Sequence, residues 1–198
     1  MAWFKRESSE IQANEEKRVR TEGLWVKCEG CRQIIWKKEL EDNLNVCTKC
    51  DYHFRIDSAQ RLMLLLDEDS IETQDEDLES TDPLNFSDTR PYKARLEKSK
   101  ASTGLKDAII NATGTMNGLP VIVSAMEYSF IGGSMGAVVG EAITRAVERA
   151  CKERKPIIVV SASGGARMME GVVSLMQMAK ISAGLMRLDE AHRSYSLL

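Results

Sequence analysis

Hydrophobic residues in the second half of the chain follow the periods of regular secondary structure. Two apolar segments, 108–116 and 119–126, flank Asn117-Gly118, a dipeptide that strongly favours a two-residue β-hairpin turn. After a glycine-rich turn, apolar residues recur at helical spacing as far as about Arg154. The residues on that face are Val139, Ile143, Ala146, Val147 and Ala150. The pattern predicts a hairpin followed by an amphipathic helix.

The segment 156–162 is continuously apolar and has the length of a strand, which is typical of a strand in a sheet covered on both faces. A second glycine-rich turn, 163–171, and a second helix to about Leu188 follow it. The predicted order is ββα and then βα, which indicates an α/β fold.

Changes in amino-acid composition along the chain divide it into four segments. Residues 1–22 form a polar lead-in, 23–57 a small cysteine-containing module, 58–102 a helical and acidic linker, and 103–198 the larger domain. Within the linker, residues 67–82 hold nine acidic side chains with little apolar periodicity, so we expect an exposed segment. Helices are expected at 58–66 and 92–102 on either side of it.

Composition limits the class of protein. The chain has 198 residues, 43% of them hydrophobic, and a formal net charge of -3, which suits a globular protein with one small and one medium domain. The leucine-rich run 62–66 is far too short to cross a bilayer. The charged N-terminus lacks the apolar core of a signal peptide, so we expect a cytoplasmic, reducing location.

The most specific motif is a pair of Cys-x-x-Cys sequences separated by fifteen residues. Its four cysteines are Cys28, Cys31, Cys47 and Cys50. This spacing is typical of a zinc ribbon, in which four thiolates surround the metal and leave no open position for a substrate. A structural zinc ion is therefore expected, and it should contribute the folding free energy that so small a module lacks. Disulfides are the alternative, and the reducing location argues against them.

The charge of the cysteine module bears on nucleic-acid binding. Between Gly23 and Ser58 there are six basic and six acidic residues, so the module has no basic surface excess. General binding to nucleic acid is therefore disfavoured. The fifth cysteine, Cys151, lies on the apolar stripe of the predicted helix and is expected to be a small buried hydrophobe.

Two glycine-rich turns follow predicted strands. In the second, Gly164 and Gly165 stand where a buried strand gives way to a helix, so their backbone N–H groups could bind an oxyanion. Two such donors aimed at a developing enolate would stabilise it by roughly 3–4 kcal/mol each. The alternative is that these glycines merely permit a tight turn. The first turn, 132–136, has the same ambiguity and lacks the Gly-Lys-Ser/Thr ending of a phosphate-binding P-loop.

Few other residues are candidates for a catalytic or binding role. Arg167 could orient a neighbouring carboxylate, bind phosphate or lie at the surface. Glu141 and Glu170 could act as acids or bases, although glutamates near helix starts usually complement the helix dipole. The only histidines, His53 and His192, do not form part of any evident Ser-His-Asp set.

These residues resemble a known family, the β subunits of bacterial-type acetyl-CoA carboxylase carboxyltransferase. The resemblance covers nearly the whole chain and includes the four cysteines and both glycine turns, with Phe130-Ile-Gly-Gly-Ser-Met-Gly136 and Ser161-Ala-Ser-Gly-Gly-Ala-Arg-Met168. Further matching segments are 1–6, 24–28, 43–47, 50–55, 82–84, 103–108, 140–141, 170–171 and 174–180.

The resemblance implies a zinc ribbon followed by a crotonase-like (ClpP/crotonase) ββα spiral domain. It implies transfer of a carboxyl group from carboxybiotin to acetyl-CoA, giving malonyl-CoA for fatty-acid synthesis. The oxyanion glycines would be Gly164 and Gly165, and Gly132, Gly133, Ser134 and Arg167 would lie on the CoA side of the site. The implied partners are an α subunit in an α2β2 assembly, the biotin carboxyl carrier protein and biotin carboxylase.

The C-terminus departs from the family's pattern. Glu190 and Ala191 still match, whereas 192–194 do not, and the family's crotonase domain continues well past this point. We therefore expect an incomplete domain with uncovered helix faces and a sheet edge, and weak stability or aggregation. The alternative functions are a non-catalytic zinc-ribbon binding module, an inactive fragment, or another acyl-CoA enzyme such as a hydratase, for which Glu141 and Glu170 are the candidate carboxylates.

Overall fold

A computed structural model describes residues 23–191 and the backbone of 195–197. The chain divides between Arg55 and Ile56 into two compact units, each considered by itself below. The predicted lead-in 1–22 lies outside the described residues, as do residues 192–194.

The first unit is built on a two-stranded antiparallel sheet. Strand β1 (Trp25–Lys27) pairs with β2 (Ile34–Trp36), and helix α1 (Lys37–Asp42) follows. Its apolar core contains only Ile35 and Leu40 besides two buried cysteines, Cys28 and Cys47. Such a core is too small to hold the unit together unaided, as the sequence predicts.

The second unit contains a five-stranded sheet in the order β3-β4-β5-β6-β7. The strands are β3 (Glu72–Gln74), β4 (Ile109–Met116), β5 (Leu119–Met126), β6 (Ile157–Val160) and β7 (Tyr195–Leu197). Strand β4 pairs antiparallel with both β3 and β5, whereas β6 pairs parallel with β5 and β7 parallel with β6. Asn117 and Gly118 both have positive φ, 52° and 76°, as a type I′ hairpin turn requires. The predicted hairpin is confirmed.

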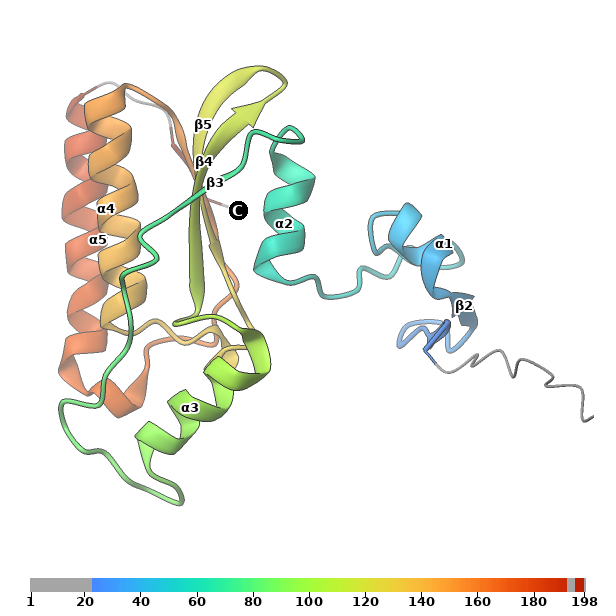
Figure 1. Ribbon diagram of the computed structural model, residues 1–198, viewed down its shortest axis with the longest axis horizontal. Coiled ribbons are helices and arrows are strands. Elements are labelled where there is room, and N and C mark those ends of the chain that lie inside the picture. The colour runs from blue at the N-terminus through green and yellow to red at the C-terminus, as the bar shows by residue number, and fades with distance from the viewer. Residues whose placement is uncertain (1–22, 192–194, 198) are drawn as a thin grey trace, which may run out of the picture. The chain divides into compact units, whose positions relative to one another are not determined.

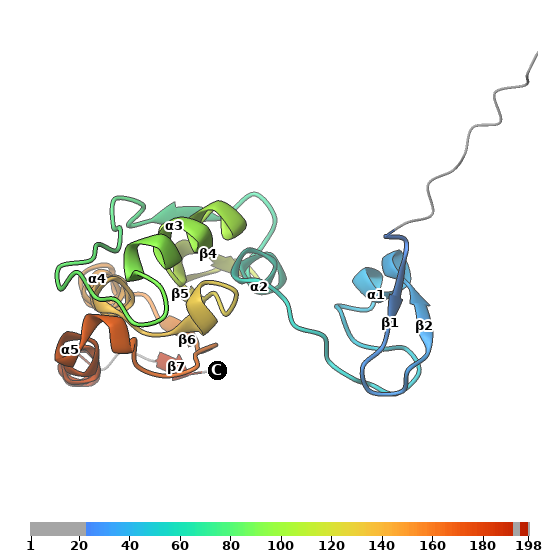
Figure 2. The ribbon, with the colours of Figure 1, turned by 90° about the horizontal axis from the view of Figure 1, so that it is seen from below.

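Helices cover both faces of this sheet (Figures 1 and 2). Helix α4 (Ala137–Glu153) lies on one face and α2 (Ser58–Leu65) on the other, while α5 (Val172–Glu190) packs against α4. Helix α3 (Tyr92–Thr103) lies near the short 3-10 helix η1 (Ile131–Gly133) at the end of β5. None of the helices in the described residues has both the length and the hydropathy needed to span a membrane.

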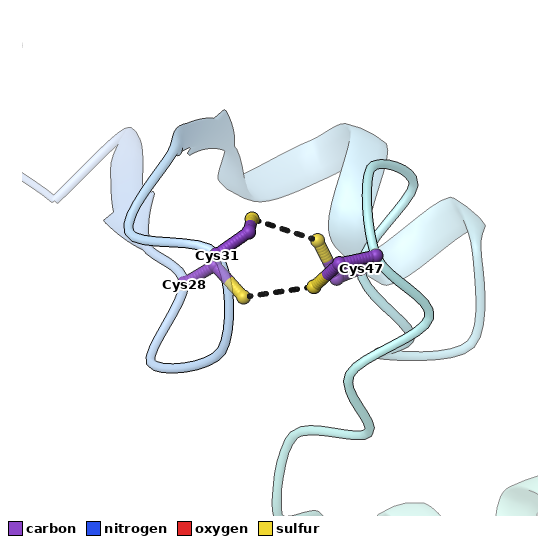
Figure 3. A group of neighbouring side chains, drawn as sticks. Cys28, Cys31 and Cys47 are labelled. Atoms are coloured by element: carbon purple, nitrogen blue, oxygen red, sulfur yellow. Dashed lines mark hydrogen bonds between the residues drawn. The ribbon is translucent and has the colours of Figure 1, made fainter.

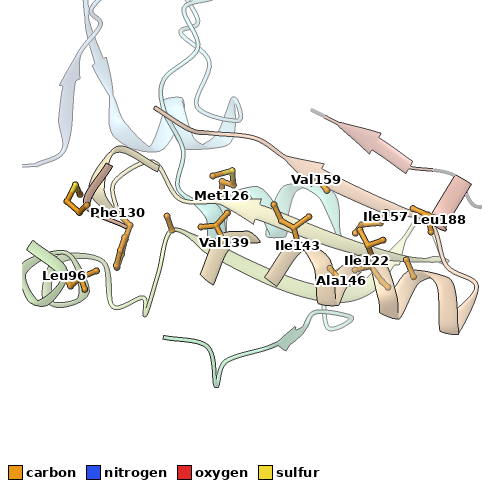
Figure 4. Packing of buried hydrophobic residues seen from close by; sticks show 14 of the residues in the cluster. Leu96, Ile122, Met126, Phe130, Val139, Ile143, Ala146, Ile157, Val159 and Leu188 are labelled. Atoms are coloured by element: carbon orange, nitrogen blue, oxygen red, sulfur yellow. The ribbon is translucent and has the colours of Figure 1, made fainter. Parts of the chain in front are cut away.

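The core between α4 and the sheet follows the predicted apolar stripe (Figure 4). All five stripe residues are at most 4% exposed, and they pack against Ile122 of β5 and Ile157 and Val159 of β6. Each large apolar side chain buried in this way contributes about 1.5–3 kcal/mol. On the opposite face, Leu62 of α2 packs against Val123 of β5. The sheet is therefore covered on both sides, as the apolar run 156–162 predicts.

Two features differ from the expectations. The acidic segment is not a free linker, because β3 adds to the edge of β4 and Asp67 accepts hydrogen bonds from the N–H groups of Asn117 and Gly118 (2.9 and 2.8 Å). A strand of three residues is too short to show a period, so backbone pairing decided its structure. In addition, the 3-10 helix η2 (Met168–Glu170) separates the second glycine turn from α5.

Helix α5 leaves much of its apolar surface exposed. Val172, Leu175, Met176 and Met178 are 51–67% exposed, while Leu188 is buried. The expected uncovered helix face is present, and aggregation through it stays a prediction.

Candidate metal centre and candidate active site

The four cysteines of the first unit converge on one point (Figure 3). Their sulfur atoms all lie within 4.8 Å of one another. Cys28 and Cys50 are 3.7 Å apart at their sulfurs, and Cys31 and Cys47 are 3.8 Å apart. Each Cys-x-x-Cys forms a tight turn, in which the N–H of Arg32 donates to the carbonyl of Cys28 and that of Asp51 to Cys47, both at 3.0 Å.

These distances test whether zinc fits. Zinc–sulfur bonds of about 2.3 Å in a tetrahedron place any two sulfurs about 3.8 Å apart, which agrees with both measured pairs. Burial raises the pKa of Cys47, but the N–H of Lys49 and hydrogen bonds from neighbouring cysteines lower it to about 7, while the other cysteines raise the pKa of Cys50 to about 12. The four thiols therefore share protons without the metal, and bound zinc would favour the thiolate form of all four. The four cysteines fit a zinc ion with a closed coordination shell, so the metal would hold the fold and supply no chemistry.

The second unit brings its two glycine-rich turns side by side. The first follows β5 and spans 130–136, and the second follows β6 and spans 162–167. Three backbone hydrogen bonds join them: the N–H of Gly164 donates to the carbonyl of Gly132 (2.8 Å), that of Met135 to Gly165 (2.8 Å) and that of Arg167 to Met135 (2.9 Å). The ends of two parallel strands are thereby held as one rigid corner.

Glycine is required where the turns approach each other most closely. A Cβ on Gly133 would lie 2.0 Å from the carbonyl oxygen of Ala162, and the residue has a φ of 64°. Gly132 and Gly165 also have positive φ, yet a Cβ on either would meet nothing within 4 Å. Gly133 therefore serves packing, whereas Gly165 borders open space.

The predicted oxyanion pair needs a correction. The N–H of Gly164 is already bound to the carbonyl of Gly132, whereas that of the exposed Gly165 donates to the hydroxyl oxygen of Ser163 at 3.1 Å, a partner on an exposed side chain. The turn also does not open α5 directly, because η2 intervenes and α5 begins at Val172. The expected contribution of that helix dipole is therefore absent at Gly164 and Gly165.

The N-terminus of α4, which follows the first turn, is occupied by the protein itself. One oxygen of Glu170 accepts the N–H of Ala137 at 2.6 Å, and a Cβ on Gly136 would lie 2.6 Å from this carboxylate. A helix N-terminus is a ready anion site. Here Glu170 takes that position, so phosphate binding at this helix end is not available to the first turn.

Arg167 lies at the centre of a buried polar cluster. Its side chain is 0% exposed and forms two hydrogen bonds with the carboxylate of Asp107, at 2.9 and 2.7 Å. It also donates to the hydroxyl and the carbonyl oxygen of Ser134, at 3.1 and 2.7 Å. Burial alone would lower the pKa of Arg167, but the hydrogen bonds and charge of Asp107 outweigh it and raise that pKa.

Further residues complete this cluster. Tyr92 donates from its hydroxyl to Glu170 at 2.6 Å and accepts from Arg167 at 3.2 Å. Burial raises the pKa of Tyr92, so its hydroxyl stays protonated and able to donate. Ser80 contacts Asp107 and Glu170 through its hydroxyl. The ring of Phe130 lies 5.6 Å from the Arg167 guanidinium carbon.

The cluster revises the role expected for Arg167. A side chain with no exposure, and with every nitrogen bound to protein, is not available to CoA, so contact with CoA is excluded in this conformation. The alternative that it orients neighbouring carboxylates agrees with the structure. Asp107, Tyr92 and Ser80 were missed, because each lies in a separate segment and no motif marks it.

The two glutamates considered as acids or bases are both engaged in ion pairs. Glu141 binds Lys180 and Arg145, whose hydrogen bonds lower its pKa. Glu170 is 4% exposed and bound as described above. Neither carboxylate is free to take a proton from a substrate, so the arrangement does not support a hydratase.

Two known families match this sequence. Residues 79–191 match the carboxyl transferase domain. Residues 25–50 match the acetyl-CoA carboxylase zinc finger domain. The two matches cover the candidate active site and the candidate metal centre respectively.

Relatives of high identity carry one name. The chain is 51% identical over 192 residues to the acetyl-coenzyme A carboxylase carboxyl transferase subunit beta of Citrifermentans bemidjiense, covering 96% of this chain and 68% of that protein. It is 47% identical over 195 residues to the subunit of the same name from Prochlorococcus marinus, covering 98% and 67%. The chain thus spans about two thirds of the length of these relatives.

Solved structures share the fold of the second unit. A transcarboxylase 12S structure with hydrolysed methylmalonyl-coenzyme A superposes with a TM-score of 0.56 at 20% identity, over 77% of this chain and 25% of that one. A Pseudomonas malonate decarboxylase hetero-tetramer in complex with malonate gives 0.53 at 26% identity, over 69% and 48%. The larger unit is therefore a crotonase-like α/β domain, as expected.

Proposed function

Because this chain belongs to the family of acetyl-CoA carboxylase carboxyl transferase β subunits, a group of biotin-dependent carboxyltransferases, we propose that it binds the acyl-CoA side of the reaction. The reaction would transfer a carboxyl group from carboxybiotin to acetyl-CoA and give malonyl-CoA. The observation that carries the proposal for this structure is the pair of glycine turns joined by backbone hydrogen bonds, in which Gly165 is exposed, has open space where a Cβ would lie, and has its N–H bound to the side chain of Ser163.

The chemistry requires little from side chains. Carboxybiotin would supply carbon dioxide on cleavage of its N–C bond, together with a ureido nitrogen basic enough to accept a proton from the methyl group of acetyl-CoA. The resulting enolate carbon forms the new C–C bond with carbon dioxide. The protein must hold the thioester in place and stabilise the negative charge that develops on its oxygen.

The N–H of Gly165 is the group that we assign to this oxygen. It lies in a turn fixed by backbone hydrogen bonds on both sides, so little reorganisation is needed as the charge develops. The missing Cβ leaves room for the thioester to approach. One donor of this kind contributes roughly 3–4 kcal/mol to the transition state. Gly132, Gly133 and Ser134 stay as proposed neighbours of CoA, and Gly164 supports the turn.

Partners follow from the same proposal. The biotin carboxyl carrier protein would bring carboxybiotin, biotin carboxylase would charge it, and an α subunit would complete an α2β2 enzyme in the cytoplasm. A non-catalytic binding module would explain the four-cysteine unit, but it would leave the buried ion cluster beneath two glycine turns without a purpose.

The test is malonyl-CoA formation by the chain co-purified with an α subunit and supplied with carboxylated carrier protein. Gly165→Ala keeps the N–H but places a Cβ where the thioester would approach, and we expect roughly a 10²-fold loss of rate, as for a misplacement of about 1 Å. Gly118→Ala is the matched control, because that glycine also has positive φ and open surroundings but lies at the hairpin tip. No product from the unmodified complex would overturn the function, and an unchanged rate in Gly165→Ala would overturn the role of Gly165.

A further inference from the structure

We propose that the buried cluster of Arg167, Asp107, Glu170 and Tyr92 holds the two glycine turns in a fixed position relative to each other. Arg167 would act on the reaction through the backbone that it holds, without touching the substrate. The inference rests on the proposed function, and its test below is designed so that either can fail alone.

The first step is that Arg167 connects segments that are distant in the sequence. It ends the second turn, yet its guanidinium binds Ser134 of the first turn through two atoms. The same group binds Asp107, which precedes β4. One side chain therefore fixes both turns relative to the end of the hairpin.

Glu170 fixes the other end of the first turn. Its carboxylate accepts the N–H of Ala137, three residues after Ser134, and also the hydroxyl of Tyr92 from α3. Arg167 reaches the same carboxylate at 3.3 Å. The segment 134–137 is thus held at both ends by two side chains that are paired with each other.

Burial makes the arrangement selective for arginine. Arg167, Asp107 and Glu170 are 0–4% exposed, so a charge left without partners would be costly. The planar guanidinium satisfies Asp107 and Ser134 at once through nitrogens with fixed directions. A lysine keeps the charge and can reach one of these partners, but it lacks the geometry to hold both.

The position of the backbone in the two glycine turns should directly affect the rate of carboxyl transfer. The N–H of Met135 donates to the carbonyl of Gly165, so a shift of the first turn moves Gly165 and with it the N–H that we assign to the thioester oxygen. A misplacement of about 1 Å in a catalytic group can cost 10²-fold in rate. Loosening the cluster should therefore lower turnover and leave ground-state binding of acetyl-CoA nearly unchanged.

The experiment compares Arg167→Lys with Arg149→Lys in the chain co-purified with its α subunit. Arg149 is the matched control, because it also pairs with a largely buried carboxylate, Asp75, but lies twelve residues along α4, about 18 Å from the helix start. We expect Arg167→Lys to lower kcat by roughly 10–100-fold, with Kd for acetyl-CoA within twofold of the unmodified value. The amide NMR resonance of Gly165 should shift in the isolated chain, whereas Arg149→Lys should change none of the three.

Tyr92→Phe is the second variant and decides the outcome if Arg167→Lys does not fold. It removes the hydroxyl that joins Glu170 to Arg167 and should lower kcat by a few-fold while shifting the Gly165 resonance. Unchanged kcat and an unmoved resonance in folded variants would overturn the inference. An equal rise in Kd with unchanged kcat would also overturn it, because that points to substrate contact. If the unmodified complex is inactive, the proposed function fails, and the Gly165 resonance alone still tests the positioning.

Discussion

Gly133→Ala tests how tightly the two glycine turns are packed. The new Cβ would lie 2.0 Å from the carbonyl oxygen of Ala162, whereas side-chain Cβ atoms essentially never come within 3.0 Å of another atom, so something must move by at least 1 Å. Both neighbours are backbone, and the Gly164-to-Gly132 hydrogen bond lies beside the contact. No flexible side chain is present to absorb the shift.

The magnitude follows from comparison with Gly132→Ala. Both glycines are left-handed, with φ of 65° and 64°, but a Cβ on Gly132 meets nothing within 4 Å. Gly132→Ala, the control variant, loses only the roughly 1–2 kcal/mol that an alanine costs in the left-handed conformation. This loss is partly offset by about 0.4–1 kcal/mol, because alanine lowers the conformational entropy of the unfolded chain. Gly133→Ala adds overpacking of about 1–3 kcal/mol and strain on the hydrogen bonds between the turns. We expect it to be about 2–4 kcal/mol less stable than the control.

The chain offers separate probes for its two units. All three tryptophans, Trp3, Trp25 and Trp36, precede residue 56, and the two that the structure describes, Trp25 and Trp36, lie in the first unit, whereas the long helices α4 and α5 lie in the second. Urea unfolding followed by far-UV circular dichroism should show the loss of stability in Gly133→Ala, while the tryptophan fluorescence transition stays in place. Equal stabilities for the two alanine variants would refute the packing argument.

Two further predictions concern the metal and a buried carboxylate. Removing zinc with a strong chelator should unfold the first unit, because structural zinc contributes about 10–16 kcal/mol to the folding of such a unit. The tryptophan emission should then change, while the helical circular dichroism signal of the second unit persists. An apo form with unchanged emission would contradict this prediction. Glu127, 4% exposed, accepts hydrogen bonds from Ser58 and Ser129 that outweigh burial and lower its pKa below the unfolded value of about 4.3. The stability that the Glu127 carboxylate contributes is therefore fully present above the unfolded pKa, and it is lost as the pH falls through the lower pKa of the folded state. Glu127→Gln should lower the free energy of unfolding, measured by urea denaturation, by about 1–3 kcal/mol at pH 7. The difference in stability between the variant and the unmodified chain should become smaller below pH 5, and a difference that stays constant with pH would refute the role of the charge.

Features that depend on neighbouring residues could be predicted from the sequence. The hairpin follows from Asn117-Gly118, since both residues accept positive φ, and the helix after the first turn follows from five apolar residues on one face. The spacing of the cysteines similarly led to a four-sulfur cluster of the right size for zinc. In each case the signal lies within one local period or motif. Strand β3 shows the limit, because its pairing with β4 depends on an edge that the sequence does not reveal.

The sequence could suggest residues for a candidate active site but not the hydrogen bonds among them, for a physical reason. Backbone N–H groups carry no sequence signature, so nothing in Gly164-Gly165 shows that the first N–H binds the carbonyl of Gly132 and the second the hydroxyl of Ser163. Likewise the sequence leaves open whether Arg167 orients a carboxylate, binds phosphate or lies at the surface until Asp107, sixty residues earlier in the chain, is placed against it. A buried arginine needs partners that satisfy its fixed directions, and only the fold can supply them. The same dependence makes the two turns sensitive: a change that moves Asp107 or Ser134 should also move the turn that bears Gly165, because Arg167 binds both residues and ends that turn.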